Sequence, residues 1–308
     1  MTEPRRVSGT IHRTGGGLYV VATAGGPHVE ASLRGRLKRE VRTGGRVVIG
    51  DRVEISPSDD TWTIESVEPR QSELVRRGRG GREAKILVAN LDRVFVIVAL
   101  RGPVATTQLI DRLLVLVESS GMQPTLVLNK SDLPDVEEVE RRLRPLYESV
   151  GYDVLVTSAK TEGGLVELHE AMCVGSSAFI GPSGVGKSSL LNAIDPALDL
   201  KTGALSKKTG NGRHTTVGSR LIELACGGLV ADTPGFGDVG LWAVPPDEVE
   251  ACFPEFAEAR DGCRFRGCAH LNEPDCAVRD GVAQSLIAES RYESYQILRA
   301  EAEENAAH

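Results

Sequence analysis

The sequence of 308 residues lacks any apolar run close to the roughly 18 residues that a membrane-spanning helix needs. Its opening residues, Met1 to Arg6, are followed by no apolar segment of the kind found in secretory signal peptides. These absences argue against a membrane-embedded or exported class of protein, so we expect a cytosolic protein without membrane contact. The composition is otherwise globular, with 41% hydrophobic and 26% charged residues, and leaves room for two or three domains.

Aromatic residues are also scarce, at 4% of the chain, and the first 90 residues contain only Tyr19 and Trp62. Base stacking therefore cannot be the main source of any nucleic-acid affinity in that region. Charge offers an alternative source, because the net charge of −7 is unevenly distributed. Residues 1–90 carry +5, residues 91–244 carry −4 and residues 245–308 carry −8.

The basic N-terminal residues are candidates for contacts with RNA phosphates. They are Arg34, Arg36, Lys38, Arg39, Arg76, Arg77 and Arg79. Phosphate contacts predict an affinity that falls steeply with salt and depends little on base sequence. The same charges would also suit an ordinary solvated surface, and composition leaves both interpretations open.

Six cysteines without an export signal favour reduced thiols or metal ligands over a disulfide framework. Cys173, Cys226 and Cys252 are scattered along the chain, and we expect them to be buried and inert. The other three cysteines are close together in sequence and lie beside a histidine.

This cluster has the pattern Cys-x4-Cys-x-His-x5-Cys, with the residues Cys263, Cys268, His270 and Cys276. Three thiolates and an imidazole complete the tetrahedron that Zn²⁺ prefers and leave no open position for catalysis. We therefore expect one structural Zn²⁺, which substitutes for a large core in a segment without strand patterns. The alternative is that the cysteines are small buried hydrophobes.

Hydrophobic patterning divides the chain into four parts. Residues 1–75 contain short β-branched runs between turns, at 18–22, 47–49, 52–55 and 62–67, which predict a small closed barrel of the oligonucleotide-binding (OB) or SH3-like type. Residues 76–90 are basic and glycine-rich, and we interpret them as a linker or mobile arm.

Residues 91–244 alternate between strand and helix patterns and predict an α/β domain with a mostly parallel sheet. The expected strands are 93–100, 124–128, 154–156, 178–180 and 228–231, and the expected helices are 107–119, 137–150 and 189–194. Residues 245–308 show no strand pattern and end in a polar helix at about 284–304, which predicts a small α-helical zinc-binding domain.

A phosphate-binding loop is the strongest motif of the α/β domain. Residues 181–188 match G-x-x-x-x-G-K-[ST] between an expected strand and an expected helix. Lys187 would reach the β- and γ-phosphates, and the Ser188 hydroxyl would bind Mg²⁺. The predicted nucleotide-binding residues are Gly181, Pro182, Ser183, Gly184, Val185, Gly186, Lys187, Ser188 and Ser189. A glycine-rich turn without a ligand is the alternative.

Two further motifs point to guanine. The predicted base-binding residues are Asn129, Lys130, Ser131 and Asp132, and, behind the base, Ser158, Ala159 and Lys160. An ionised Asp132 accepts two hydrogen bonds, which matches the N1–H and N2 amine of guanine and matches nothing on adenine. Each tetrapeptide alone is a weak signal, and a surface turn or a helix cap is the alternative. Their position at strand ends, together with the phosphate loop, favours a ligand site.

The segment Asp232-Thr-Pro-Gly235 matches the second switch of GTPases. Asp232 would reach Mg²⁺ through water, and the Gly235 amide would contact the γ-phosphate. A switch threonine is expected between the phosphate loop and Asp232. We prefer Thr216 as this Mg²⁺ ligand, with Thr215 as the alternative.

The order of these motifs is permuted. In Ras-like GTPases the phosphate loop comes first, whereas here the guanine motifs precede it. A circular permutation keeps the spatial order of the strands while the termini move to another surface loop. The second switch then leads directly into the C-terminal domain.

A permuted GTPase core between an N-terminal barrel and this cysteine–histidine module resembles the bacterial family of GTPases that depend on the small ribosomal subunit. The family also has the segments found here at 213–216 and 232–236, although Val217 stands where a third threonine is frequent. The resemblance implies an OB-fold barrel, binding of GTP, GDP and ribosomal RNA, and GTP hydrolysis stimulated by the small subunit during its late maturation, followed by release of the factor.

The water-orienting residue is the open point of this resemblance. Phe236 occupies the place of the Ras-type glutamine and cannot bond water. Our hypothesis is that His214 orients or deprotonates the attacking water once the ribosome orders its loop. The alternative is that His214 is a solvated residue or an RNA contact.

Other functions remain open from sequence alone. A nucleotide switch without catalysis would explain Phe236, and a P-loop kinase would share the phosphate loop, although residues 129–132 argue against a kinase. No heptad pattern or long exposed apolar strip indicates a partner subunit, so a monomer is expected. The basic barrel should face ribosomal RNA, and the acidic C-terminal helix should point away from it or towards basic ribosomal protein.

Overall fold

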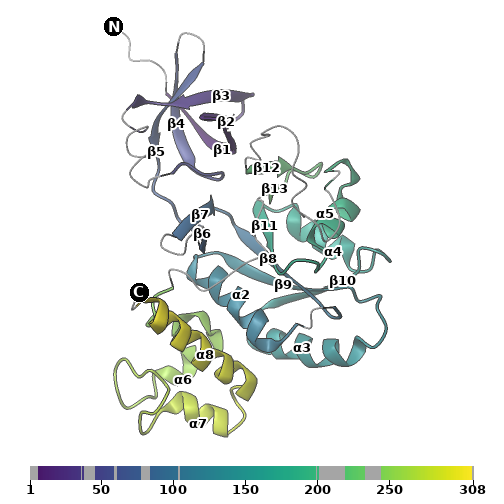
Figure 1. The fold of residues 1–308 in the computed structure, drawn as a ribbon, viewed down its shortest axis with the longest axis vertical. Helices are drawn as coiled ribbons and strands as arrows, with labels where there is room; N and C mark the ends of the chain where they lie inside the picture. The colour runs from purple at the N-terminus through teal and green to yellow at the C-terminus, as the bar shows by residue number, and fades with distance from the viewer. Residues whose placement is uncertain are drawn as a thin grey trace, which may run out of the picture.

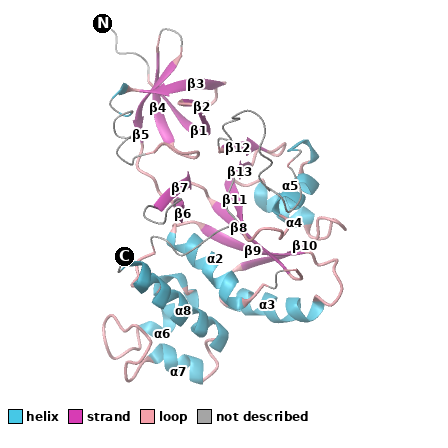
Figure 2. Ribbon diagram, viewed as in Figure 1, coloured by secondary structure: helices cyan, strands magenta, loops and turns pink. Residues whose placement is uncertain are grey.

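The computed structural model describes residues 6–35, 37, 46–58, 61–77, 84–102, 105–198, 200, 219–232 and 244–306, without the side chains of Arg76, Arg77, Ala84 and Asp232. Within these ranges a β-barrel, an α/β layer and a helical module follow one another along the chain (Figure 1). Strands form the first part and helices form the last, with the two mixed between them (Figure 2). None of the helices in the described part has the length and apolarity to cross a bilayer.

The barrel closes on itself. Its strands are β1 (Val7–Gly15), β2 (Leu18–Thr23), β3 (His28–Leu33), β4 (Arg52–Pro57) and β5 (Trp62–Val67). They pair in the order β1-β2-β3-β5-β4, and β4 pairs back onto β1. Alternate residues such as Ile11, Val21 and Ile64 fill the interior, as the two-residue period of a strand requires. This closure confirms the predicted OB-like barrel.

Two details of the barrel region differ from expectation. The apolar run 47–49 is not a strand, and Ile49 forms only an isolated bridge to Val88. Instead of a plain linker, the next region provides β6 (Glu73–Arg77) and β7 (Ala84–Ala89), which pair as a two-stranded sheet. Leu74 and Val88 of this pair are fully buried, so the segment packs as part of the structure.

The α/β layer contains a six-strand section in the order β10-β9-β8-β11-β13-β12. Its strands are β8 (Arg93–Ala99), β9 (Gln123–Asn129), β10 (Asp153–Thr157), β11 (Ser176–Ile180), β12 (Arg220–Glu223) and β13 (Leu229–Asp232). Its helices are α2 (Thr107–Ser119), α3 (Glu137–Ser149), α4 (Leu165–Met172) and α5 (Lys187–Ile194), followed by a short turn of 3₁₀ helix at Pro196–Leu198. Only β12 runs antiparallel to its neighbour, which confirms the predicted mostly parallel sheet.

The apolar strand β8 explains why helices cover both faces of this sheet. Val94, Val96 and Val98 belong to the cluster that includes α2 and α3 residues. The intervening Phe95 and Ile97 belong to the cluster that includes α4 and α5 residues. A continuous apolar run is therefore buried on both sides, as in other parallel sheets.

The barrel joins the α/β layer through backbone pairing. β1 runs antiparallel to β12 with Arg13 opposite Arg220, and the Thr14 amide donates to the Ser219 carbonyl at 3.2 Å. The described strands of both parts, apart from β6 and β7, thus form one sheet of 11 strands.

The C-terminal module is helical, as predicted. It contains 3₁₀ turns at Glu250–Cys252 and Pro254–Phe256, and the helices α6 (Ala257–Arg260), α7 (Ala277–Ala283) and α8 (Glu289–Ala306). Phe253, Phe256 and Tyr295 form its aromatic centre, with ring centroids 5.0–5.5 Å apart. The module therefore has a compact core of its own in addition to the cysteine cluster.

Helix α8 docks on α2 through buried charges. Arg291 has no exposed surface, donates to Asp111 at 2.5 Å and grips both carboxylate oxygens of Glu255 at 2.7 and 2.9 Å. Arg112 pairs with Glu301 at 2.6 Å in the same contact. The acidic helix is therefore packed against the α/β layer along this side.

Candidate functional site

The predicted phosphate loop connects β11 to α5, as expected. Gly181, Gly184 and Gly186 have φ values of +143°, +84° and +102°, which favour glycine. A Cβ atom on Gly181 would lie 2.1 Å from the Ile97 carbonyl oxygen, and one on Gly186 would lie 2.4 Å from Asn129 Nδ2. The loop thus has the backbone shape and the close packing that a phosphate cradle needs.

Lys187 begins helix α5 and folds back over this loop. Its ammonium donates to the carbonyls of Gly181 at 2.7 Å and Pro182 at 2.9 Å. Burial lowers the pKa of Lys187 from its usual value, because the charged form loses hydration. A phosphate would return a full negative charge to this partly dehydrated ammonium. Ser188 and Ser189 follow in the first turn of the helix, half-buried.

The predicted guanine loop is tied to the phosphate loop by one side chain. Asn129 ends β9, is 1% exposed, and donates from Nδ2 to the Val185 carbonyl at 2.7 Å. Its Oδ1 accepts a hydrogen bond from Thr157 at the end of β10. Asn129 therefore links the ends of β9 and β10 to the phosphate loop. The Val185 side chain is itself buried, so only its backbone is available to a ligand.

Asp132 is held in place by the second guanine motif. The Ser158 hydroxyl donates to Asp132 Oδ1 at 2.7 Å and accepts from the amides of Lys160 and Thr161. The Ser131 amide donates to the Thr157 carbonyl, and Lys130 adopts a left-handed φ of +67°. Ala159 is half-buried and Lys160 is exposed beside them. The arrangement leaves Asp132 Oδ2 available to accept a further hydrogen bond.

The predicted switch residues are only partly covered. Asp232 ends β13, which runs parallel to β11, so its backbone lies at the same sheet edge as the phosphate loop. Its side chain, like His214, Thr215, Thr216 and Gly235, lies outside the described residues. The Mg²⁺ and catalytic assignments of these residues stay predictions.

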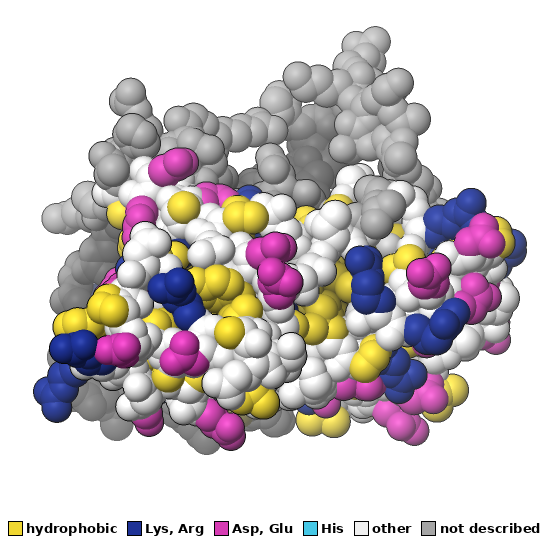
Figure 3. Space-filling view, turned by 90° about the horizontal axis from the view of Figure 1, so that it is seen from below, with side chains coloured by type: hydrophobic (Ala, Val, Ile, Leu, Met, Phe, Trp, Pro, Cys, Tyr) yellow, Lys and Arg dark blue, Asp and Glu magenta, His cyan; other side chains and the backbone are white. Residues whose placement is uncertain are grey.

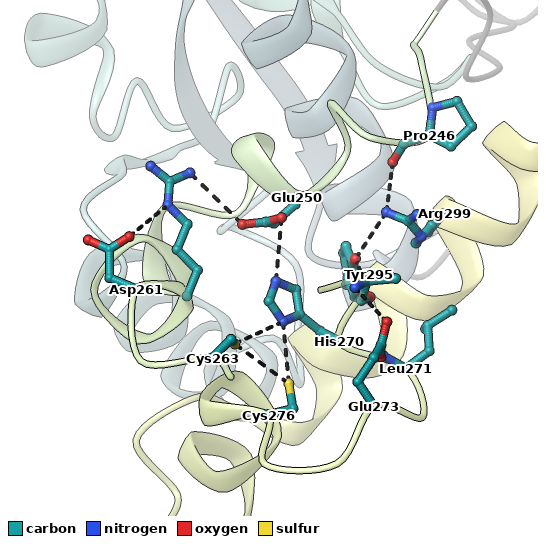
Figure 4. Close-up of polar contacts among 12 residues, drawn as sticks. Pro246, Glu250, Asp261, Cys263, His270, Leu271, Glu273, Cys276, Tyr295 and Arg299 are labelled. Atoms are coloured by element: carbon teal, nitrogen blue, oxygen red, sulfur yellow. Dashed lines mark hydrogen bonds and ion pairs between the residues drawn. The ribbon is translucent and has the colours of Figure 1, made fainter. Parts of the chain in front are cut away.

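The four predicted metal ligands converge in the C-terminal module. Figure 4 shows three of them, Cys263, His270 and Cys276. His270 Nδ1 lies 3.3 Å from Cys276 Sγ and 3.6 Å from Cys263 Sγ, and these two sulfurs are 4.0 Å apart. With Cys268 included, all four ligand atoms lie within 4.8 Å of one another. The cluster could hold a metal ion at its centre.

The surroundings fit a bound cation. His270 is 1% exposed, and its Nε2 lies 3.4 Å from the Glu250 carboxylate, an ion-pair distance without an aligned hydrogen bond. A metal-bound histidine usually directs its second nitrogen to such a group. Although burial opposes it, backbone N–H groups around Ala269 and Leu271 lower the pKa of Glu273 to about 2, and this carboxylate braces the ligand loop.

Few of the predicted RNA-binding residues can be placed. Arg34 is 62% exposed in its side chain and pairs with Glu65, so part of its charge is already neutralised. Arg76 and Arg77 lie in β6, where only their backbone is described. Arg36, Lys38, Arg39 and Arg79 lie outside the described residues.

The expectation for the scattered cysteines is right for one and wrong for two. Cys252 is buried and its thiol donates to the Glu248 carbonyl. Cys173 and Cys226 instead form a disulfide, and Cys226 is exposed. Sequence spacing could not reveal this pair, because 53 residues separate them and only the fold brings them together.

Comparisons with known proteins agree with this geometry. Residues 67–242 match the family model described as RsgA GTPase. A protein of Gemmatimonas aurantiaca called "Small ribosomal subunit biogenesis GTPase RsgA" is 44% identical over 96% of this chain and 97% of its own. A Moorella thermoacetica protein of the same name is 42% identical over the same shares.

Two solved structures have the same overall fold. The structure of YjeQ from Thermotoga maritima covers 97% of this chain and 99% of its own, with 34% identity and a TM-score of 0.79. That of YloQ, described as a circularly permuted GTPase, covers 97% and 96%, with 30% identity and a TM-score of 0.77. These matches extend over the barrel, the α/β layer and the helical module together.

Proposed function

The chain belongs to the RsgA GTPase family of GTP-hydrolysing enzymes, and on that premise we propose that it hydrolyses GTP on the small ribosomal subunit during late maturation of that subunit. The relatives named above carry the biogenesis role in their names. The observation in this chain that supports the proposal best is the Asn129–Val185 hydrogen bond, because it joins a guanine-selecting loop to a phosphate loop.

The side chains around Asn129 divide the recognition of GTP between them. Asp132, oriented by Ser158, accepts the N1–H and N2 amine of guanine. Lys187 moves from the loop carbonyls to the β- and γ-phosphates, whose charge it neutralises. Adenine offers Asp132 no paired donors, so the site discriminates against ATP.

The magnesium ion of GTP fits the oxygen donors at this edge of the sheet. Ser188 lies in the first turn of α5, and the candidates Asp232 and Thr216 or Thr215 offer further oxygens of the type that Mg²⁺ prefers. When bound, the ion neutralises phosphate charge in the transition state. We further propose that His214 orients the attacking water, since Phe236 cannot.

Contact with ribosomal RNA is proposed for the barrel and the basic residues near it. Arg34 and its neighbours in sequence provide phosphate contacts, which explains how a chain of net charge −7 binds RNA. On the face seen in Figure 3, acidic and basic side chains of the described residues are interspersed, without a broad basic surface among them. Hydrolysis is stimulated by the subunit and followed by release of the protein.

We also propose a bound metal, an oligomeric state and a location for the protein. The cluster of Cys263, Cys268, His270 and Cys276 holds one structural Zn²⁺, because three sulfurs and a nitrogen suit that ion and leave no reactive position. The protein acts as a monomer in the cytosol, where small subunits mature.

The decisive experiment titrates GTP turnover with mature and immature small subunits. We expect turnover to rise with subunit concentration, and the stimulation to fall steeply as salt is raised. Turnover that neither subunit changes would contradict the proposal.

A variant pair tests the guanine contact. Asp132→Asn should weaken GTP binding about 100-fold and relax the preference for GTP over ATP. The matched control is Asp135→Asn, because the Asp135 side chain is 85% exposed and only pairs with Arg101. Equal effects of the two substitutions would show that Asp132 does not contact the base.

A further inference from the structure

The Cys173–Cys226 disulfide joins two elements at the end of the sheet opposite the phosphate loop. Cys173 is the C-terminal cap of α4, and Cys226 lies in the exposed turn between β12 and β13. Their Cα atoms are 5.5 Å apart. Close backbone packing supports this proximity, because a Cβ atom on Gly228 would lie 2.0 Å from the Met172 carbonyl oxygen. The fold therefore brings the two sulfurs together across the end of the sheet.

A histidine lies beside one of the two sulfurs. His169 is one turn earlier on α4, and its Nε2 is 3.6 Å from Cys173 Sγ. An N–H group of the ring at this distance can donate a hydrogen bond to a thiolate. Cys252 has the opposite surroundings, since burial raises the pKa of its thiol to about 12. The surroundings of Cys173 thus favour thiol–disulfide exchange, whereas those of Cys252 oppose it.

We propose that Cys173 and Cys226 are a reversible thiol–disulfide switch that ties the β12–β13 turn to the end of α4, with His169 as the positioning residue that promotes the exchange. The oxidant is a small-molecule disulfide of the glutathione type. The exposed Cys226 thiolate attacks it, forms a mixed disulfide and releases one small thiolate. The Cys173 thiolate then attacks Cys226 Sγ and releases the second. Two protein thiols are oxidised, and one small disulfide is reduced to two thiols.

The reverse path uses the same geometry. A reducing thiolate reaches the exposed Cys226 sulfur, and Cys173 leaves as a thiolate beside His169. A hydrogen bond from the His169 ring to the departing thiolate would stabilise it. A second reducing thiol then frees Cys226, so both directions depend on His169.

The switch would act on the hairpin that links the two main parts of the molecule. β12 pairs with barrel strand β1, and β13 pairs with β11 and ends at Asp232. When the bond is closed, the hairpin turn cannot leave α4, and the barrel contact is held with it. Any effect on GTP turnover rests on the proposed function, whereas the bond and the mobility of the hairpin do not.

The first test measures the bond without nucleotide or ribosome. The full-length protein is equilibrated in mixtures of reduced and oxidised glutathione, and free thiols are trapped by alkylation and identified by mass spectrometry. We expect Cys173 and Cys226 to oxidise together and to be recovered on reduction, while Cys252 stays reduced. Both thiols remaining free in oxidised glutathione would overturn the proposal.

Variants of α4 test the role of His169. His169→Gln should slow closure about three- to tenfold, and His169→Lys, which places an ammonium group at the same position, should recover the rate. Glu167→Gln, an exposed position on the same helix, is the matched control and should change the rate less than twofold. Equal rates for His169→Gln and the wild type would remove His169 from the mechanism.

The last test follows the hairpin and the metal content. Amides of β12 and β13 should exchange at least about tenfold faster in the reduced protein, and Cys226→Ser should match the reduced form. Identical amide exchange in both redox states would refute the proposed restraint of the hairpin by the disulfide.

His169, Cys173 and Cys226 also lie close enough to hold a metal. A second zinc equivalent in the reduced wild type that is absent from Cys226→Ser would overturn the switch in favour of a metal site.

Discussion

In the α/β layer the predicted ligand-binding groups lie at the ends of buried parallel strands, whereas in the C-terminal module the predicted metal ligands lie on turns around short helices. Asn129, Ser158 and Lys187 are held by hydrogen bonds within the protein itself. The sulfurs of Cys263 and Cys276 contact each other and His270, and Cys268 belongs to the same cluster. The first site is thus preorganised by the fold, whereas the proposed zinc site would rely on its ion to hold the ligands together.

The contact between these two regions follows a third principle. Arg291 is fully buried, and it forms ion pairs with Asp111 on α2 and Glu255 in the module. Its guanidinium also lies 4.6 Å from the centre of the Phe253 ring. Buried charges with few partners tolerate only one docking geometry, so this cluster sets how the module sits on α2.

Removing the proposed metal should affect the C-terminal module far more than the α/β layer, and this is the largest difference we expect between the two regions. Chelation, or Cys276→Ser, should cost the module on the order of 10 kcal/mol and abolish its tertiary structure. Nucleotide binding by the α/β layer should survive, because the hydrogen bonds that hold Asn129, Asp132 and Lys187 do not involve the module. Near-ultraviolet circular dichroism and GTP binding measure the two effects separately.

Cys252→Ser is the control for this experiment, since Cys252 is buried in the module but lies outside the ligand cluster. It should retain zinc and structure. A module that keeps its fold without metal would end the contrast between the two regions.

Breaking the contact between the regions should have the next largest effect. Arg291→Ala leaves Asp111 and Glu255 buried without a counter-charge and should destabilise the protein by about 3–5 kcal/mol in urea unfolding. Arg264→Ala removes an exposed pair with Asp275 and should cost less than about 1 kcal/mol. Equal costs would mean that burial does not govern the contact.

Lys187→Ala should affect ligand binding but not stability. Loss of the ammonium should weaken GTP binding about 100-fold, or about 2.8 kcal/mol, because a charge-assisted contact to phosphate is lost. The zinc content and the urea midpoint should remain those of the wild type. A large fall in stability would show that the Gly181 and Pro182 contacts hold the loop together.

The smallest effect is expected at Glu273. Glu273→Gln should destabilise the module by about 1 kcal/mol, since a neutral amide accepts the backbone N–H groups more weakly than a carboxylate. The pKa of Glu273 is depressed in the folded protein, so its contribution is complete above pH 4.5 and is lost as the pH falls towards 2. The difference in unfolding free energy between variant and wild type should shrink over that range.

Asp275→Asn is the control for Glu273→Gln, because the Asp275 side chain is exposed and makes only the surface pair with Arg264. Its effect should be smaller at every pH. A difference for Glu273→Gln that does not change with pH would contradict the role of its charge.

The α/β layer was predictable from sequence almost element by element. Helix α2 begins and ends at the predicted residues, and β8, β9 and β11 lie within two residues of their predicted bounds. Long apolar runs and helical periodicity are local patterns, so strands and helices of this kind can be recognised without knowing which elements they pack against. The shorter α4 and β12, of eight and four residues, had no such signal.

The joints of the molecule were not predictable in this way. β1 mixes polar and apolar residues without a clear strand pattern, and it pairs with β2, β4 and β12. The segment that forms β6 and β7 resembles a basic linker in sequence, because it has few apolar residues. Only the folded structure shows that two of them, Leu74 and Val88, are buried. These elements depend on contacts between distant parts of the chain.

The sequence by itself determined the motifs, their permuted order and the residue types around each predicted ligand, because these depend on spacing along the chain. Only the tertiary structure decided that Cys173 bonds to Cys226, that Arg291 pairs with Asp111 on α2, and that β12 pairs with the barrel strand β1. Each of these joins residues far apart in sequence. Their proximity comes from the packing of whole elements, which no local pattern records.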